Sequence, residues 1–225
     1  MSWVESESNR ANRNLFLINL IFGLAAGAGA VDIVSDIVAQ WNFRAPFGVW
    51  MMAIALAAIF GLAGWNCIKA FARYRDIEKA PIWRRLAVFG QPQQLSAEIE
   101  QDLFAPTVKY KSMRLTPNWL IQRFFFSSYP SPIADVAWVY ELVTRHRTNG
   151  IPTGKTYSAI ILGRHKQKFT VRASRKKVDA LIAELNQRAP WAIFGFNEEL
   201  RTIWNKNHPA FLAAVDDRKQ KLRQK

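Results

Sequence analysis

The residues best suited to chemistry form a cluster of cations in the second half of the chain. They run from the end of one expected strand, along the next, into the start of an expected helix: Arg164, His165, Lys166, Lys168, Arg172, Arg175, Lys176 and Lys177. Backbone N–H groups at a helix start already favour an anion, and added cations strengthen that preference. Since each Lys or Arg contributes about 1 kcal/mol near an anionic membrane, the cluster predicts a site for anionic lipid or an acidic partner. A solvated basic face that protects an edge strand is the alternative.

The other residue types that support catalysis are scattered. His146, His165 and His208 lie in different segments without metal-ligand spacing, and Cys67 lies in an apolar segment. The sequence contains neither a glycine-rich phosphate loop nor a Gly-x-Ser-x-Gly motif. We therefore expect a protein that binds rather than catalyses, with no cofactor and no metal.

Two aspartates, Asp32 and Asp36, are four residues apart at the end of an apolar segment. This spacing puts both carboxylates on one face of a helix. They could bind a cation or pair with an arginine of a partner. Alternatively, they mark the outer boundary of the lipid headgroups.

The net charge is +14, but it is unevenly distributed along the 225 residues. Up to residue 68 there are three basic and four acidic residues, so all of the surplus lies beyond that point. Such a surplus suggests nucleic acid, an anionic membrane surface or acidic proteins as partners. We do not expect nucleic acid, because the aromatic residues are predicted to lie in the core rather than exposed for base stacking.

Two apolar segments are each long enough to cross a bilayer, which needs roughly 20 residues. Residues 15–31, extendable to 38, and residues 47–68 predict a hairpin of transmembrane helices at about 15–38 and 47–73. A secretory signal ending at Ala28-Gly29-Ala30 is a competing interpretation of the first segment. Glu5 and Glu7 argue against it, because a signal peptide begins with a basic region.

Flanking charges predict the orientation of this hairpin. Arg10 and Arg13 precede the first segment and Lys69 begins a basic stretch after the second, whereas the connection carries Asp32 and Asp36. Basic flanks stay in the cytoplasm. We therefore expect a multi-pass protein of the cytoplasmic (inner) membrane with both termini cytoplasmic.

Small residues in both segments predict close helix packing, within the hairpin or against another membrane protein. They are Gly23, Gly27, Ala53, Ala57 and Gly61. Asn19 and Asn66 lie toward the cytoplasmic end of the two segments. We expect these two amides to lie close enough to hydrogen-bond each other.

The rest of the chain predicts a cytoplasmic domain. Residues 1–14 form the cytoplasmic N-terminus, 15–75 the hairpin and 76–106 a linker with a short helix after Pro81 and a second one capped by Ser96. Residues 107–190 then contain five β-segments and an amphipathic helix over 174–188 with Ser174 as N-cap. The β-segments are 107–116, 118–126, 133–147, 155–164 and 168–173. Residues 191–225 form a C-terminal helical extension.

The motifs LTPNWLI and IADVAWVY, followed by a basic strand and an amphipathic helix behind a membrane hairpin, give the chain a recognisable order. In this it resembles bacterial pleckstrin-homology-like (PH-like) membrane proteins. The resemblance implies an α+β fold in which an antiparallel partial barrel or curved sheet, capped by a C-terminal helix, follows two transmembrane helices. It also implies a binding or assembly module without a common ligand.

We therefore expect a non-catalytic scaffold, an accessory or assembly subunit of a larger membrane protein complex. Its partners would be other integral membrane subunits or a second copy of the chain, together with membrane lipids. One alternative is a sensor of anionic phospholipid headgroups that uses the cluster at 164–177, and another is a membrane-bound enzyme. A second candidate partner surface, which could equally complete the core, comprises Trp191, Phe194, Phe196 and Trp204.

Overall fold

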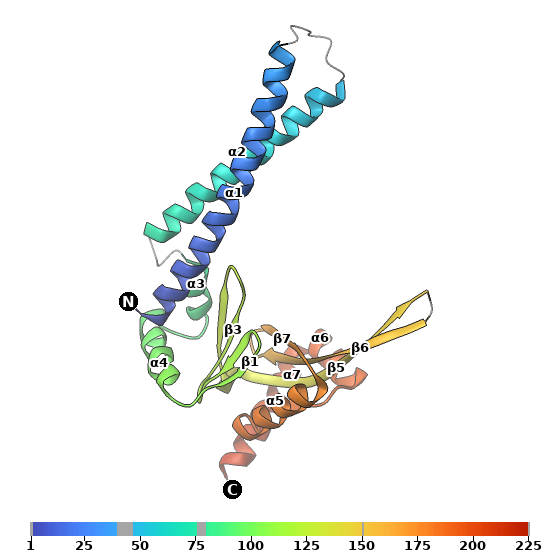
Figure 1. Ribbon diagram of the computed structural model, residues 1–225. Coiled ribbons are helices and arrows are strands. Elements are labelled where there is room, and N and C mark those ends of the chain that lie inside the picture. The colour runs from blue at the N-terminus through green and yellow to red at the C-terminus, as the bar shows by residue number, and fades with distance from the viewer. Residues whose placement is uncertain (1, 40–46, 76–79, 150, 225) are drawn as a thin grey trace. The chain divides into compact units, whose positions relative to one another are not determined.

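The computed structural model describes residues 2–39, 47–75, 80–149 and 151–224 (Figure 1). Within these ranges, the side chains at 34, 36–39, 47–49 and 73–75 are not described. The chain forms two compact units. Unit 1 comprises Met1–Val88 with Phe125–Ser128, and unit 2 comprises Phe89–Phe124 with Tyr129–Lys225. The division between the units thus falls near residue 88, within the segment expected as a linker (residues 76–106).

Unit 1 contains two long helices, α1 (Trp3–Ala39) and α2 (Phe47–Arg75), followed by the short α3 (Pro81–Leu86). Both long helices are long and apolar enough to cross a membrane, over Trp3–Ile33 and Trp50–Ala72. Only 11% of the most apolar window of each is buried by the rest of the protein. Their apolar side chains therefore face outward, unlike those of a core helix.

Helix α1 begins at Trp3 and not near residue 15 as expected. Ser2 and Glu5 explain the early start, because each side chain caps the backbone of the other. The Ser2 N–H donates to Glu5 Oε2 (2.8 Å), and the Glu5 N–H donates to Ser2 Oγ (3.3 Å). This reciprocal pair is the capping box, which satisfies two otherwise unpaired backbone donors.

The contact between α1 and α2 uses part of the expected set of small residues. A Cβ at Gly23 would lie 3.2 Å from the Ala63 Cβ, and one at Gly27 would lie 3.0 Å from the Phe60 ring. Ala53 is also buried, but Ala57 and Gly61 are exposed, so these two lie outside the hairpin contact.

The two asparagines do not pair as expected. Asn19 Nδ2 donates to the Leu15 carbonyl of its own helix (2.7 Å), and Asn66 is exposed. No hydrogen bond joins the two amides in the described part of the chain. Bonding within one turn satisfies the Asn19 donor without a partner on α2.

Unit 2 begins with α4 (Pro92–Phe104) and continues through two four-stranded sheets. The first has the order β1-β2-β3-β4, comprising Val108–Tyr110, Met113–Leu115, Trp119–Arg123 and Ser128–Pro132. The second has the order β7-β6-β5-β8, comprising Lys168–Ala173, Ile151–Gly163, Val136–Thr148 and Ile193–Phe194. The remaining elements are the 3-10 turn η2 (Ile133–Asp135), α5 (Arg175–Arg188), α6 (Glu198–Lys206) and α7 (His208–Arg223).

Two hydrophobic clusters hold unit 2 together. The first joins both sheets and α5, and includes Met113, Leu115, Leu120, Val139, Ile161, Phe169, Val171, Val178, Leu181 and Leu185. The second joins the opposite face of the second sheet to α6 and α7 through Trp138, Ile160, Leu162, Trp204, Phe211 and Val215. The second sheet is therefore buried on both faces where it lies between the helices. With its separate sheets and helices, the chain is a mixed α+β protein.

Several element boundaries differ from the expected ones. The segment 107–116 is a hairpin of two strands that turns at Lys111, where φ is 48°. Helix α4 starts at Pro92, since proline fits the first turn of a helix, and Ser96 is buried inside it. Strand β4 was not expected, because Pro130 and Pro132 weaken the strand pattern.

Candidate binding surfaces

The structure divides the cationic cluster of residues 164–177. Arg164 lies in a two-point ion pair with Asp216 of α7, with Nη1–Oδ1 at 2.6 Å and Nη2–Oδ2 at 2.8 Å. The hydrogen bonds raise the pKa of Arg164 and lower the pKa of Asp216. Arg164 therefore fastens α7 to the end of β6 and is not a free cation for a ligand.

His165 also faces a carboxylate of its own domain. Its Nε2 lies 3.6 Å from Asp135 Oδ2, and its ring contacts Phe89 edge-on. Burial raises the pKa of Asp135, although His165, Arg164 and Lys219 act in the opposite direction. The pair therefore holds the turn after β6 against η2.

Lys166 is exposed in the turn before the edge strand β7, and the remaining cations lie on opposite sides of that strand. Phe169 and Val171 point into the first core with α5, so Lys168 and Arg172 project from the other face of the strand. Arg175, Lys176 and Lys177 are exposed on the first turn of α5. The cluster is thus distributed around an edge strand, in keeping with a protective role as well as with binding.

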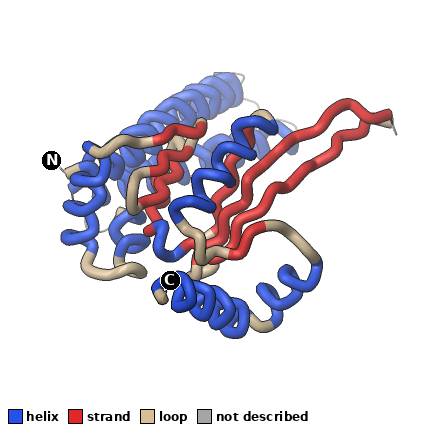
Figure 2. The backbone as a smooth tube through the Cα atoms, turned by 90° about the horizontal axis from the view of Figure 1, so that it is seen from below, coloured by secondary structure: helices blue, strands red, loops and turns tan. Residues whose placement is uncertain are grey.

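A long exposed feature of unit 2 is the outer part of the β5–β6 hairpin, residues 142–149 and 151–156, here called the arm. Figures 1 and 2 show it extending beyond the other strands of its sheet. Strand β7 pairs with β6 only over Tyr157–Leu162, and β8 pairs with β5 only at Trp138 and Val139. In the described residues, both outer edges of the arm are therefore open to another strand.

The arm carries apolar and cationic side chains together. Leu142 and Val143 are exposed, and Ile151 is 68% exposed. Arg145 and Lys155 lie directly opposite each other in the register. No Asp or Glu occurs between positions 142 and 156. Like charges opposite each other destabilise a strand pair. The two cations are therefore unfavourable in the hairpin alone and would be stabilised by an anion bound from outside.

The sequence contained a signal for the arm. Asn149-Gly150 between two strand-like runs is typical of a two-residue hairpin turn, and Asn149 has φ of 50°. The two segments were expected as strands over 133–147 and 155–164, so the strands themselves are confirmed. Their extension beyond the sheet depends on where β7 and β8 end, which neither strand sequence reveals.

The C-terminal aromatic residues mostly complete the core. Trp191 and Phe194 pack against the first cluster, and Trp204 belongs to the second. Only Phe196 is exposed, at 47%, and it stacks on Trp138 with ring centroids 6.1 Å apart. Trp204 is therefore a core residue, and Trp191 and Phe194 are partly buried against the core.

The aspartates at the end of α1 are only partly described. Asp32 is exposed, and its backbone carbonyl accepts a hydrogen bond from Ser35 Oγ (2.8 Å). The side chain of Asp36 lies outside the described residues. No group of three or more His, Cys, Asp or Glu side chains that could hold a metal ion occurs in the part of the chain that was described.

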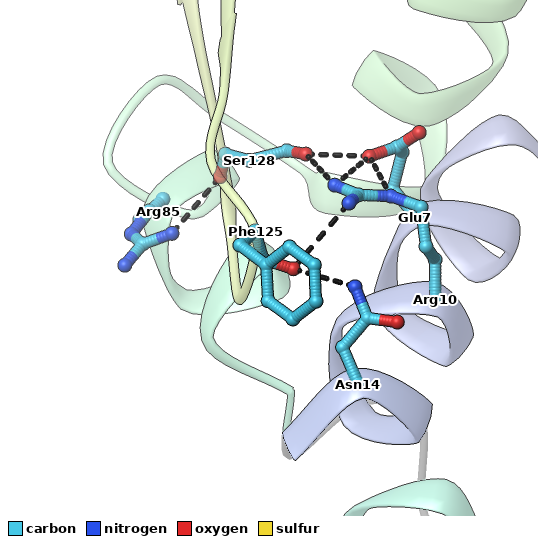
Figure 3. A network of polar contacts seen from close by, with 6 residues as sticks. All are labelled: Glu7, Arg10, Asn14, Arg85, Phe125 and Ser128. Atoms are coloured by element: carbon cyan, nitrogen blue, oxygen red, sulfur yellow. Dashed lines mark hydrogen bonds and ion pairs between the residues drawn. The ribbon is translucent and has the colours of Figure 1, made fainter. Parts of the chain in front are cut away.

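A polar network in unit 1 was not anticipated from the sequence (Figure 3). Glu7 of α1 is 5% exposed, and its Oε2 accepts bonds from Arg10 Nη2 (2.8 Å) and from Ser128 Oγ (2.6 Å). Arg85 Nη1 donates to the Ser128 carbonyl (2.9 Å). The buried carboxylate is thus compensated by a cation and a hydroxyl, as its burial requires.

The same network holds an aromatic loop. Asn14 Nδ2 donates to the Phe125 carbonyl (2.9 Å), and Arg10 Nη1 lies 3.4 Å from the same oxygen. The Phe125 ring is 59% exposed, and that of Phe126 is exposed beside it. The Phe125 carbonyl is hydrogen-bonded to α1 while the two rings remain exposed to the surroundings. The contact therefore holds these rings at the polar end of α1.

A buried carboxylate in unit 2 was also missed. Asp102 of α4 accepts hydrogen bonds from Thr116 Oγ1 (2.5 Å), from the Asn118 N–H (2.8 Å) and from Asn118 Nδ2 (2.9 Å). The LTPNWLI motif therefore contains a turn that is fixed to α4. Both carboxylate oxygens are occupied by these bonds, which indicates a structural role.

Taken together, these features define an α+β protein with two helices long and apolar enough to cross a membrane. The chain belongs to the family described as Domain of unknown function (DUF6709), whose model matches residues 82–204. The match begins in α3 and ends in α6, so it includes the arm and the basic cluster. No curated protein and no solved structure matches the chain.

Proposed function

We propose that this protein is a membrane-anchored, non-catalytic scaffold, an accessory or assembly subunit of a larger membrane protein complex. In this proposal α1 and α2 span the cytoplasmic membrane with both termini in the cytoplasm. Support comes from their outward-facing apolar side chains and from the basic residues at their polar ends. The exposed rings of Phe125 and Phe126 would then lie at headgroup depth, which aromatic side chains favour.

We further propose that unit 2 is PH-like. Support comes from the first core, in which two sheets pack together with the amphipathic helix α5, although the expectation was a single partial barrel or curved sheet. Because folds of this kind serve unrelated ligands, the fold alone does not identify the partner. The surface must do so.

The observation that carries the proposal is the arm. Its open strand edges can accept a strand of a partner, and Leu142, Val143 and Ile151 offer apolar contacts beside it. Arg145 and Lys155 select an acidic surface, since opposite charges steer association and exclude like-charged partners. The partner of the proposal is thus an acidic region of another membrane-complex subunit.

The test is affinity purification of the full chain in mild detergent. The proposal predicts a stoichiometric protein partner that is lost from the charge-reversed variant R145E/K155E. The variant K168E/R172E, which reverses two exposed cations on β7, is the matched control and should keep the partner. A chain that purifies alone, or a partner retained by R145E/K155E, would contradict the proposal.

A second candidate function is sensing of anionic phospholipid. The observation in its favour is that Lys168, Arg172, Lys176 and Lys177 remain exposed. If they face lipid, acetylation of these lysines in nanodiscs should slow when anionic lipid replaces zwitterionic lipid, whereas Lys206 on α6 should not change. Equal protection in both lipids would remove the sensor.

A further inference from the structure

A cavity of about 720 Å³ lies between the polar end of α1 and the last turns of α2, entirely within unit 1. Phe16, Ala70 and Phe71 form its apolar wall, and its polar lining includes Arg10, Asn12 and Arg13. Its volume falls in the range of small-molecule sites, about 300–1,000 Å³. The cavity therefore combines cationic and amide side chains with an apolar surface.

One buried donor of the polar wall, the side-chain amide of Asn12, has no described partner. Asn12 is 5% exposed, and its Nδ2 has no hydrogen-bond partner among the described residues. A buried donor without an acceptor is unfavourable, so this amide is suited to donate to an acceptor oxygen of a ligand. Arg13 is exposed beside it, and no described carboxylate forms an ion pair with it.

Arg10 differs from Arg13 because Glu7 holds it in place. Its Nε and Nη2 both lie within 3.1 Å of Glu7 Oε2. The guanidinium is therefore fixed in orientation, while its charge is offset by the carboxylate. Among the described residues, Arg13 supplies a positive charge at this cavity that no carboxylate pairs.

We propose that this cavity binds the phosphodiester of a single anionic phospholipid. Asn12 Nδ2 and the Arg13 guanidinium donate to the phosphate oxygens, and an acyl chain lies along Phe16 and Phe71. The cavity has an apolar wall on one side and donors on the other, which matches an amphiphile with an anionic head. The inference rests on the proposed membrane placement, which puts this end of both helices at the cytoplasmic headgroups.

The test uses native mass spectrometry of the full chain in mild detergent with added phosphatidylglycerol. One lipid should remain bound per chain. R13Q should weaken retention on the order of tenfold, since it removes a charge-assisted hydrogen bond, and N12L should weaken it as well. R13K keeps the charge and should retain most binding.

Two controls make the outcome decisive. K69Q removes a cation at the same end of α2 that does not line the cavity, and should retain the lipid. Soluble glycerophosphate, which has the head without the chains, should fail to displace the lipid. Because R13Q changes an exposed side chain, its result stands even if N12L fails to fold.

The inference is overturned if the wild-type chain retains no lipid, or if R13Q retains as much as K69Q. Displacement by glycerophosphate would overturn the lipid assignment in favour of a free phosphate site. Resistance of the protein to alkaline extraction from membranes tests its placement separately. A protein that stays in the membrane but binds no lipid contradicts this inference alone.

Discussion

Replacing Arg145 and Lys155 by threonine tests whether the arm is built for a partner at the expense of its own stability. The two cations lie directly opposite each other in the β5–β6 register. The variant R145T/K155T removes their repulsion and adds a cross-strand threonine pair like Thr144–Thr156. A favourable cross-strand pair contributes on the order of 0.2–1 kcal/mol and opposed like charges are destabilising, so the exchange should stabilise the arm by about 0.5 kcal/mol.

The assay is hydrogen exchange of the arm amides in the full chain, read by mass spectrometry. A gain of about 0.5 kcal/mol slows local opening about twofold. The part of the effect that comes from charge should disappear at about 1 M salt, where charges are screened within about 3 Å, and only the contribution of the threonine pair should remain. The same variant should lose the partner, although its arm is more stable. Unchanged exchange at low salt, or a difference of the same size at low and high salt, would refute the reasoning.

Three further predictions concern the scaffold of the two units. G27L should weaken the α1–α2 contact, because even a Cβ at that position would lie 3.0 Å from a ring of α2. G61L should not weaken it, because a Cβ at that position meets nothing within 4 Å. Thermal unfolding of the two variants in detergent compares their stabilities. The Arg164 ion pair lowers the pKa of Asp216. The pair therefore stabilises α7 fully above a pH of about 3.9, the pKa of an unfolded aspartate, and this stabilisation is lost as the pH falls through the folded pKa. D216N should remove this acid dependence of the protection of α7 in hydrogen exchange. D102A leaves buried donors unpaired and should lower the free energy of unfolding by about 1–3 kcal/mol, whereas a D102A stability equal to wild type would show that these bonds are dispensable.

Much of the fold follows from local patterns in the sequence. The apolar segments predict α1 and α2, and the alternation Lys168-Phe169-Thr170-Val171 predicts a strand with one apolar face. The start of α1 was also readable, since Ser2 and Glu5 have the spacing of a capping box. Apolar periodicity alone missed it, because the first turns of that helix are polar.

The surfaces depended on contacts that local patterns do not contain. Gly23 and Gly61 are both glycines, yet only Gly23 faces the other helix, because the rotation of each helix about its axis is set by the whole interface. The cationic cluster looked continuous along the chain, but α5 packs on one face of β7 and Lys168 projects from the other. Arg164 was predicted to be a binding residue because its actual ion-pair partner, Asp216, lies 52 positions away in the sequence and local patterns do not reveal it.

The most direct test of the central claim is photo-crosslinking from the arm in intact membranes. A photoreactive residue replaces Ile151, and a matched probe replaces Ile203 on α6, which is exposed but lies outside the arm. The account predicts one discrete protein adduct from position 151, none from position 203, and loss of the adduct when R145E/K155E is added. No adduct from position 151, or an adduct that survives the charge reversal, would contradict the proposal that the arm binds an acidic partner.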